Sequence, residues 1–165
     1  MRFSDLLSKT KYKNSTLLFL SKQSKIAWDF DETLVDGKAS DVCQQFIKDT
    51  PNIEHYILTA RSDDWLVNSI FPELARYPAK LTRANFAEVL TSDHEKHEEF
   101  RQARHLRKIG KLTGPLIPIE IYEYTIKGKR CRELGIPVLV DNDIPRSKPG
   151  CDKYNIRLID PLDCL

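Results

Sequence analysis

The stretch IAWDFDETLVDG, residues 26–37, decides the fold prediction. A short apolar run ends in two carboxylates two positions apart, Asp29 and Asp31. Residues i and i+2 of a strand point to the same side, so both side chains are expected to project together from its carboxyl end. Paired like charges call for a cation, and Mg²⁺ prefers carboxylate oxygens. We therefore expect a metal and phosphate site at the edge where open α/β sheets bind ligands; the alternative is an ordinary acidic strand-to-turn junction.

The overall composition is that of an ordinary globular chain. The sequence has 165 residues, enough for one domain, of which 41% are hydrophobic and 30% charged. A net charge of +2 gives no general argument for nucleic acid or an anionic membrane. No apolar run approaches a membrane span, and residues 17–20 are too short for a signal core, so we expect a cytoplasmic protein without a membrane partner. The four cysteines are widely spaced and are expected as reduced thiols.

A β-helix-β pattern includes the quoted stretch. Apolar residues at helical spacing predict a helix over 40–49, which ends at Pro51. Residues 55–59 then indicate a second strand, parallel to the first through a right-handed crossover. Before the first strand, Phe3, Leu6 and Leu7 fit one helical turn, and residues 17–20 are expected to pack on the core.

Thr59 closes the second strand and is the next candidate site residue. Its hydroxyl is expected at the same sheet edge as Asp29, where it would donate to a phosphate oxygen. The alternative is a threonine that starts a turn and caps the following helix, although Ser62 can supply that cap. Arg61 is a further candidate for phosphate contact.

Charged helices are expected in the middle of the chain. A helix is predicted over 63–76, with a kink or break at Pro72. A capping box at 92–95 predicts a second, highly charged helix that ends at Gly110, with early acids and late bases that suit the helix dipole. Residues 83–112 are therefore either a solvated helical insert or a small cap whose basic end meets an anionic substrate. Two histidines on this helix, His94 and His97, indicate a solvated face rather than a metal site.

Further strands are expected toward the carboxyl terminus. Residues 116–122 are predicted as a third strand, with Pro118 in its first residues or at an edge. A helix from about Thr125 to Leu134 would end at Gly135, and strands are predicted over 137–140 and 156–160.

Two residues from this part complete the candidate site. Asp141 follows the strand at 137–140 and offers the third carboxylate for Mg²⁺, and Asp143 is a possible helper. Lys127, near the start of the preceding helix, is expected to reach the same edge and neutralise phosphate charge. Lys129 is a rival for that role by position.

The order of these motifs resembles the haloacid-dehalogenase-like (HAD) phosphohydrolases. Asp29-Phe30-Asp31-Glu32-Thr33 is similar to their Asp-x-Asp-x-Thr signature, Ile57-Leu58-Thr59 to their second motif, and the stretch from Lys127 to Asp141 to the third and fourth motifs of HAD-type 5′-nucleotidases. The similarity covers roughly residues 26–145. It implies an α/β, Rossmann-like fold with a mostly parallel sheet, helices on both faces and no large cap, in one domain over 1–165.

The resemblance also implies a mechanism. Asp29 would attack phosphorus and form an aspartyl-phosphate, while Asp31 would act as general acid and then general base. Mg²⁺ would contact the side chains of Asp29 and Asp141 and the backbone carbonyl of Asp31. Thr59 and Lys127 would hold the oxygens of the transferring phosphoryl group.

The substrate is left open among several classes. A nucleotide 5′-phosphate fits the stretch from Lys127 to Asp141, although Pro145, Pro149 and Gly150 are expected to replace the helix that nucleotidases carry there. A protein serine phosphatase is suggested by DETLV and VDND, which resemble carboxyl-terminal-domain phosphatases, and a nucleic-acid end phosphatase by the basic segment 101–111. A HAD-like binding or regulatory module with weak catalysis is the alternative from another class.

Overall fold

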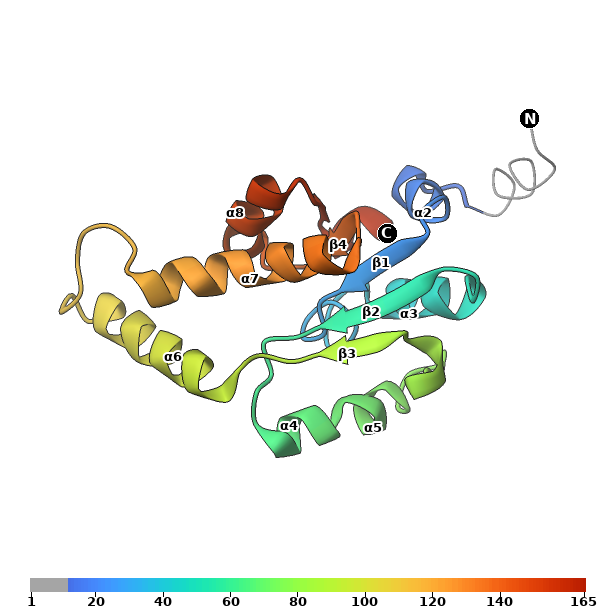
Figure 1. Ribbon diagram of the computed structural model, residues 1–165. Helices are drawn as coiled ribbons and strands as arrows, with labels where there is room; N and C mark the ends of the chain where they lie inside the picture. Colours follow the sequence, from blue (N-terminus) through green and yellow to red (C-terminus); the bar gives the residue numbers. More distant parts are fainter. Residues whose placement is uncertain (1–11) are drawn as a thin grey trace.

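A five-stranded, all-parallel sheet forms the centre of the protein (Figure 1). The computed structural model describes residues 12–165, so the helical turn expected at Phe3, Leu6 and Leu7 lies outside the described residues. The strand order is β3-β2-β1-β4-β5. The strands are β1 (Lys25–Trp28), β2 (Glu54–Leu58), β3 (Glu88–Leu90), β4 (Val138–Val140) and β5 (Arg157–Ile159). The α/β class and the parallel sheet predicted from the sequence are confirmed.

Alternation along the strands creates two hydrophobic cores, one on each face of the sheet. Ile26 and Trp28 of β1 lie in one cluster of buried side chains, while Ala27, between them, lies in the other. Helices cover both clusters, which explains why the central strands are apolar on both faces. The first face is covered by α2 (Ser15–Leu20), α3 (Ser40–Asp49) and α5 (Ile70–Leu74), and the second by α7 (Pro118–Leu134) and α8 (Ile144–Tyr154). The short helix α4 (Asp64–Asn68) has no buried residue.

A helical hairpin extends beyond the carboxyl ends of the strands. It consists of α6 (His94–Lys108) and the first turns of α7, and Figure 1 shows both leaving the body of the molecule on the side to which the strand arrows point. A small core of its own, built on Phe100 and Ile119, joins the two helices. Arg107 of α6 reinforces it by donating two hydrogen bonds to Glu120 of α7, at 2.6 and 2.8 Å.

The strand expected over residues 116–122 is wrong, because this segment begins helix α7. Pro118 occupies the first turn of the helix, where its missing N–H costs nothing. Glu120 accepts a hydrogen bond from the backbone N–H of Ile117 at 2.9 Å and so caps the same turn. The third strand along the chain is instead β3, a half-buried edge strand of three residues inside the 83–112 segment. The helical part of that segment consists of α6 and a short 3-10 helix, Arg83–Asn85.

The sequence predicted that Pro145, Pro149 and Gly150 would prevent a helix after Asp143. That prediction is wrong, because these residues lie within helix α8. Pro145 lies in its first turn, and the Asp143 side chain caps that turn by accepting from the N–H of Arg146 at 3.4 Å. Gly150 is required by packing, since a Cβ there would lie 2.7 Å from the carbonyl oxygen of Thr125 in α7. A Cβ on Gly128 of α7 would lie 2.3 Å from the backbone of Gly150. The two glycines therefore let α7 and α8 touch backbone to backbone.

Other predicted elements are close to those observed. The helix expected over 63–76 is divided into α4 and α5 at Ser69, three residues before Pro72. Leu17 and Leu20 of α2 are buried in the core, as expected. All four cysteines are buried and free. Among residues 12–165 there is no helix whose length and hydropathy would let it cross a membrane.

Candidate active site at the carboxyl edge of the sheet

Three of the predicted site residues come directly after neighbouring strands. Asp29 follows β1, Thr59 follows β2 and Asp141 follows β4. The backbone N–H of each still donates to the adjacent strand, at 2.8 Å to Val140, 3.0 Å to Leu90 and 3.1 Å to Ile159, respectively. The sheet therefore fixes all three backbone positions, and all three residues are buried. This is the edge at which parallel α/β sheets bind ligands.

Lys127 joins two of these residues from the middle of α7. Its Nζ donates to Oδ1 of Asp29 and to Oδ2 of Asp141, both at 2.7 Å. Burial acts against the charged ammonium, but the two carboxylates outweigh it and raise the pKa of Lys127. The rival Lys129 is half-exposed and lies 3.8 Å from Glu133 on the outer side of the helix. The structure therefore brings Lys127, and not Lys129, into the site.

One lysine faces two buried carboxylates, so the cluster carries excess negative charge. Burial raises the pKa of Asp29 to about 6, Lys127 opposes that rise, and Asp141 adds to it. Asp29 is thus a carboxylate that is costly to ionise without a further cation or hydrogen-bond donor.

Further polar groups orient the two carboxylates. Asp141 accepts from the hydroxyl of Ser147 at 2.6 Å and from the backbone N–H of Asp143 at 2.9 Å. The hydroxyl of Thr33 lies 3.3 Å from Oδ2 of Asp29 and accepts from the backbone N–H of Asn142 at 3.2 Å. Asp143, a possible metal helper by sequence, contributes its backbone N–H to Asp141 and its side chain to the cap of α8.

Ser147, Asn142 and Thr33 were not among the predicted site residues. Thr33 belongs to the Asp-x-Asp-x-Thr pattern, so its place in that pattern was an available signal. Ser147 lies six residues after Asp141, in the first turn of α8. It reaches Asp141 only because the helix begins so soon after that residue. No local pattern marks such a residue.

The strand alternation on which the pairing of Asp29 and Asp31 was predicted does not extend to Asp31. Strand β1 ends at Trp28, and Asp31 forms an isolated bridge with Val35 in the following loop, so the two-residue alternation of a strand does not continue to Asp31. Its side chain is 53% exposed and accepts two hydrogen bonds from Arg61, from Nη2 at 2.6 Å and from Nε at 3.1 Å. The two carboxylates therefore have different partners: a lysine for Asp29 and an arginine for Asp31.

Arg61 has no N–H left for a phosphate group in this arrangement, contrary to its predicted role. Besides Asp31, its guanidinium donates to both carboxylate oxygens of Glu73, at 2.8 and 3.0 Å, and to Ser69 Oγ and Leu66 O, at 2.8 and 3.0 Å. A guanidinium has five N–H groups, and these contacts use all of them. Arg61 instead fixes the position of Asp31 and is itself fixed by α4 and α5.

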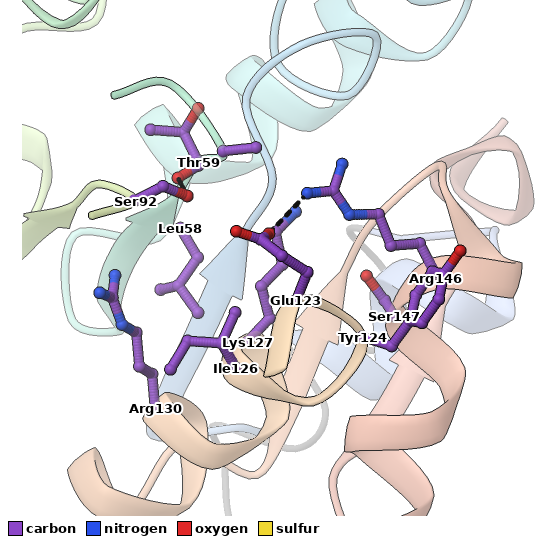
Figure 2. A pocket seen from close by; sticks show the side chains of 11 residues that line it. Leu58, Thr59, Ser92, Glu123, Tyr124, Ile126, Lys127, Arg130, Arg146 and Ser147 are labelled. Atoms are coloured by element: carbon purple, nitrogen blue, oxygen red, sulfur yellow. Dashed lines mark hydrogen bonds and ion pairs between the residues drawn. The ribbon is translucent and has the colours of Figure 1, made fainter. Parts of the chain in front are cut away.

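Thr59 occupies the far side of the site. Its hydroxyl accepts from the backbone N–H of Arg61 at 3.1 Å, and its hydrogen remains available to an acceptor in the site. Figure 2 shows Thr59 and Lys127 on opposite sides of a small cavity of about 20 Å³, with Glu123 and Arg146 above Lys127. Asp63, rather than Ser62, occupies the cap position of α4, with no side-chain hydrogen bond.

The carboxylates of Asp29 and Asp141 are the candidate ligands for a divalent cation. Within residues 12–165 no three acidic, histidine or cysteine side chains gather as a metal-binding group. Two carboxylates, Asp29 and Asp141, flank Lys127, and the carboxylate of Asp31 is taken by Arg61. Mg²⁺ typically takes one or two carboxylates and completes its octahedron with water and substrate phosphate. Two hard oxygen donors with uncompensated negative charge fit that pattern.

The comparisons with known proteins find no match for this chain. No protein-family model matches it, and neither do curated proteins nor solved structures. These comparisons therefore assign the chain to no family.

Proposed function

We propose that the protein is a Mg²⁺-dependent phosphomonoester hydrolase of the HAD-like type, acting through an aspartyl-phosphate on Asp29. The observation that carries this proposal is the Asp29–Lys127–Asp141 cluster at the carboxyl edge of the sheet, with Thr59 facing it. The resemblance of the sequence motifs, in their order along the chain, adds support.

The first half-reaction follows from the position of Asp29. Its carboxylate oxygen forms a bond to phosphorus while the bond from phosphorus to the ester oxygen breaks. Lys127, which donates to Asp29, and the Thr59 hydroxyl, which lines the same cavity as Lys127, hold the phosphoryl oxygens. Asp31 supplies a proton to the departing ester oxygen. Both oxygens of Asp31 accept hydrogen bonds from Arg61, so proton delivery requires Asp31 to give up one of those hydrogen bonds.

The second half-reaction removes the phosphoryl group from Asp29. Asp31, again a carboxylate, takes a proton from water as the water oxygen bonds to phosphorus, and the bond from phosphorus to Asp29 breaks. Arg61 positions the Asp31 carboxylate for this step through two hydrogen bonds. Asp29 and Asp141, with the backbone carbonyl of Asp31, would hold Mg²⁺, which would supply positive charge to neutralise the phosphate.

The best substrate class is a small phosphomonoester, with nucleotide 5′-phosphates first. The stretch from Lys127 to Asp141 resembles nucleotidases, and α8 removes the objection based on Pro145 and Pro149. The connection between β1 and α3, residues 29–39, is short, so the proposed enzyme has no large cap there. The hairpin of α6 and α7 is the candidate cover for the site.

The test is phosphate release with and without Mg²⁺ from mononucleotides, phosphopeptides, 5′- and 3′-phosphorylated oligonucleotides, and p-nitrophenyl phosphate. Asp29→Asn is the blank, because an amide cannot act as the nucleophile. We expect Mg²⁺-dependent release from mononucleotides and the aryl phosphate, and none from the variant.

Each outcome of this panel has a meaning. Preference for phosphopeptides or oligonucleotides would keep the chemistry and replace the substrate class. Near-normal activity of Asp29→Asn would overturn the mechanism. No release from any substrate by the folded protein would favour the binding module.

A further inference from the structure

We propose that Glu123 and Arg146 bind hydroxyl groups of the alcohol that carries the phosphate, so that the site selects phosphate esters of sugars, nucleoside 5′-phosphates included. This inference rests on the proposed phosphatase and assigns its substrate class to two residues outside the catalytic motifs. Three observations support it: the place of Glu123 on α7, the hydrogen-bonding groups that Glu123 and Arg146 leave unused, and the cavity that both residues share with Lys127 and Thr59.

Glu123 lies one helical turn before Lys127 on the same face of α7. Four residues of helix correspond to about 6 Å along its axis. Figure 1 shows that the first turns of α7 lie beyond the sheet edge and that the helix runs back from there toward the sheet. Glu123 comes earlier in the helix than Lys127, so it lies farther from the sheet. A phosphate held by Lys127 and Thr59 would therefore have its ester group near Glu123. That distance suits a hydroxyl a few bonds from the ester oxygen.

Glu123 is buried, with 2% of its side chain exposed, yet only one of its oxygens is hydrogen-bonded. Oε2 accepts from Nη2 of Arg146 at 2.8 Å. Oε1 lies 3.8 Å from Nδ1 of His97, too far for a hydrogen bond, and that buried nitrogen has no partner among the described residues either. Oε1 is not one of the fully buried unpartnered atoms among the described residues. It therefore faces the cavity, where it can accept a hydrogen bond from water or from a bound group.

Arg146 provides the complementary donors. Its guanidinium stacks on the ring of Phe100 at 4.8 Å, which fixes its plane beside Glu123. No hydrogen bond between described residues uses its Nε or Nη1. A hydroxyl group both donates and accepts, so it can donate to Oε1 of Glu123 while a neighbouring hydroxyl oxygen accepts from Arg146.

Glu123 and Arg146 line the same cavity as Lys127 and Thr59, the two proposed phosphate ligands (Figure 2). A phosphate held by Lys127 and Thr59 therefore brings its ester group next to Glu123 and Arg146. A substrate hydroxyl that displaces water from these two side chains and reproduces its hydrogen bonds keeps the enthalpy and releases the water. An ester without hydroxyls displaces the water without replacing its hydrogen bonds.

The experiment compares adenosine 5′-monophosphate with its 2′,3′-dideoxy analogue, which lacks only the ribose hydroxyls. For the wild-type protein with Mg²⁺ we expect kcat/KM to be at least tenfold higher for the nucleotide with hydroxyls. Glu123→Gln and, separately, Arg146→Lys should reduce that ratio about tenfold. The matched control is Glu133→Gln, which removes an exposed carboxylate from the far end of α7 and should leave the ratio unchanged.

Failure of this inference and failure of the proposed function give different results. A wild-type ratio near one, or variants that slow both nucleotides equally, would overturn the hydroxyl site while hydrolysis persists. If neither nucleotide is hydrolysed, affinities for both are measured with Asp29→Asn and with the Asp29→Asn, Glu123→Gln double variant. A tenfold preference that only the first variant shows supports the hydroxyl site as a binding site; equal affinities overturn it.

Discussion

Asp29 and Asp31 are two residues apart in the chain, yet their surroundings differ in almost every respect. Asp29 is buried, shares one lysine with Asp141, and has a pKa raised to about 6. Asp31 is half-exposed and has an arginine of its own, held in turn by Glu73. The buried carboxylate of Asp29 is therefore expected to be stabilised by a further cation or by bonding to phosphorus. The carboxylate of Asp31 already has its hydrogen-bond donors from Arg61 and needs neither.

The comparison shows which of the two clusters is left electrostatically unsatisfied. The Lys127 cluster leaves negative charge uncompensated in a buried place, which costs stability in the absence of a cation. The Arg61 cluster is fully hydrogen-bonded and serves to position a side chain. Four predictions test this contrast, in order of decreasing free energy.

Removal of the lysine should have the largest effect. Lys127→Met leaves Asp29 and Asp141 buried without their cation, and breaking a buried ion pair from one side typically costs about 3–5 kcal/mol. Chemical denaturation of the metal-free protein at pH 7 measures this loss. Lys129→Met, on the outer side of the same helix, is the control and should change stability by less than about 1 kcal/mol. Equal losses for the two variants would contradict the assignment of Lys127.

Neutralising Asp29 should stabilise the metal-free protein. The pKa of Asp29 is about 6 in the folded protein, against 3.8 for an unperturbed aspartate, so the fold favours the protonated carboxyl. Ionisation of Asp29 therefore lowers the stability of the fold as the pH rises from 3.8 through 6. Asp29→Asn removes that cost, about 2–3 kcal/mol at pH 7 and little at pH 4. Asp31→Asn should give no gain, because it removes the partner of Arg61.

Mg²⁺ gives the second half of that measurement. It should raise the melting temperature of the wild-type protein more than that of Asp29→Asn, since ligands that bind only the folded state stabilise it. If Asp29→Asn is no more stable than the wild type at pH 7 without metal, the contrast between the two carboxylates is refuted.

His55 should add an independent acid sensitivity in the core. Its Nδ1 accepts from the indole N–H of Trp28 at 3.1 Å, so the neutral ring carries its proton on Nε2, toward Thr50. Burial lowers the pKa of His55 to about 4, while the contact with the Thr50 carbonyl opposes the change. Stability from the neutral ring is therefore present above pH 6.5 and is lost as pH falls from 6.5 toward 4.

The loss should reach about 2 kcal/mol at pH 5 and should be reduced in His55→Gln, as denaturation at several pH values would show. This control sharpens the comparison, because a fall in activity near pH 6 belongs to the site only where the core is intact. The same acid sensitivity in wild type and His55→Gln would contradict the role of His55.

Loosening Arg61 should have the smallest effect. Arg61→Lys keeps the charge but loses the fork that holds both oxygens of Asp31. We expect about a tenfold lower rate for alkyl phosphates, which need a proton from a well-placed acid, and little change for p-nitrophenyl phosphate, whose leaving group is stable as an anion. Arg76 lines the same surface cavity as Arg61 and Glu73, so Arg76→Lys is the control. Equal losses on both substrates would leave Arg61 with a structural role only.

The sequence predicted the strands that hold the site better than the surroundings of its side chains. Strands β1, β2 and β4 were visible as apolar runs that end in polar residues, and that pattern also marked Asp29, Thr59 and Asp141. Strand β3 was missed because three half-buried residues at an edge carry too little pattern. Residues 116–122 alternate like a strand, but their first turn is capped by Glu120 and bound by Arg107, a partner that local sequence does not reveal.

The partner of Asp31 was equally hidden from local reasoning. Arg61 was predicted as a phosphate ligand because it follows Thr59, but the acceptors that occupy it come from Ser69 and Glu73, whose approach depends on how α4 and α5 fold back. The prediction of α8 failed for a related reason: prolines and glycine disfavour an isolated helix, whereas contact with α7 requires a glycine there.

The glycine contact between α7 and α8 also has a consequence for how this sequence can diverge. Lys127 and Gly128 are adjacent, one needed for charge and the other for the absence of a side chain, and Gly150 answers Gly128 from the opposite helix. A Cβ at either glycine meets backbone, which cannot move aside, whereas the space around Gly110 and Gly114 at the hairpin tip is open. Distant relatives are therefore best sought by the pair Lys-Gly and its partner glycine after the late aspartate, with hairpin tips of any length before the pair.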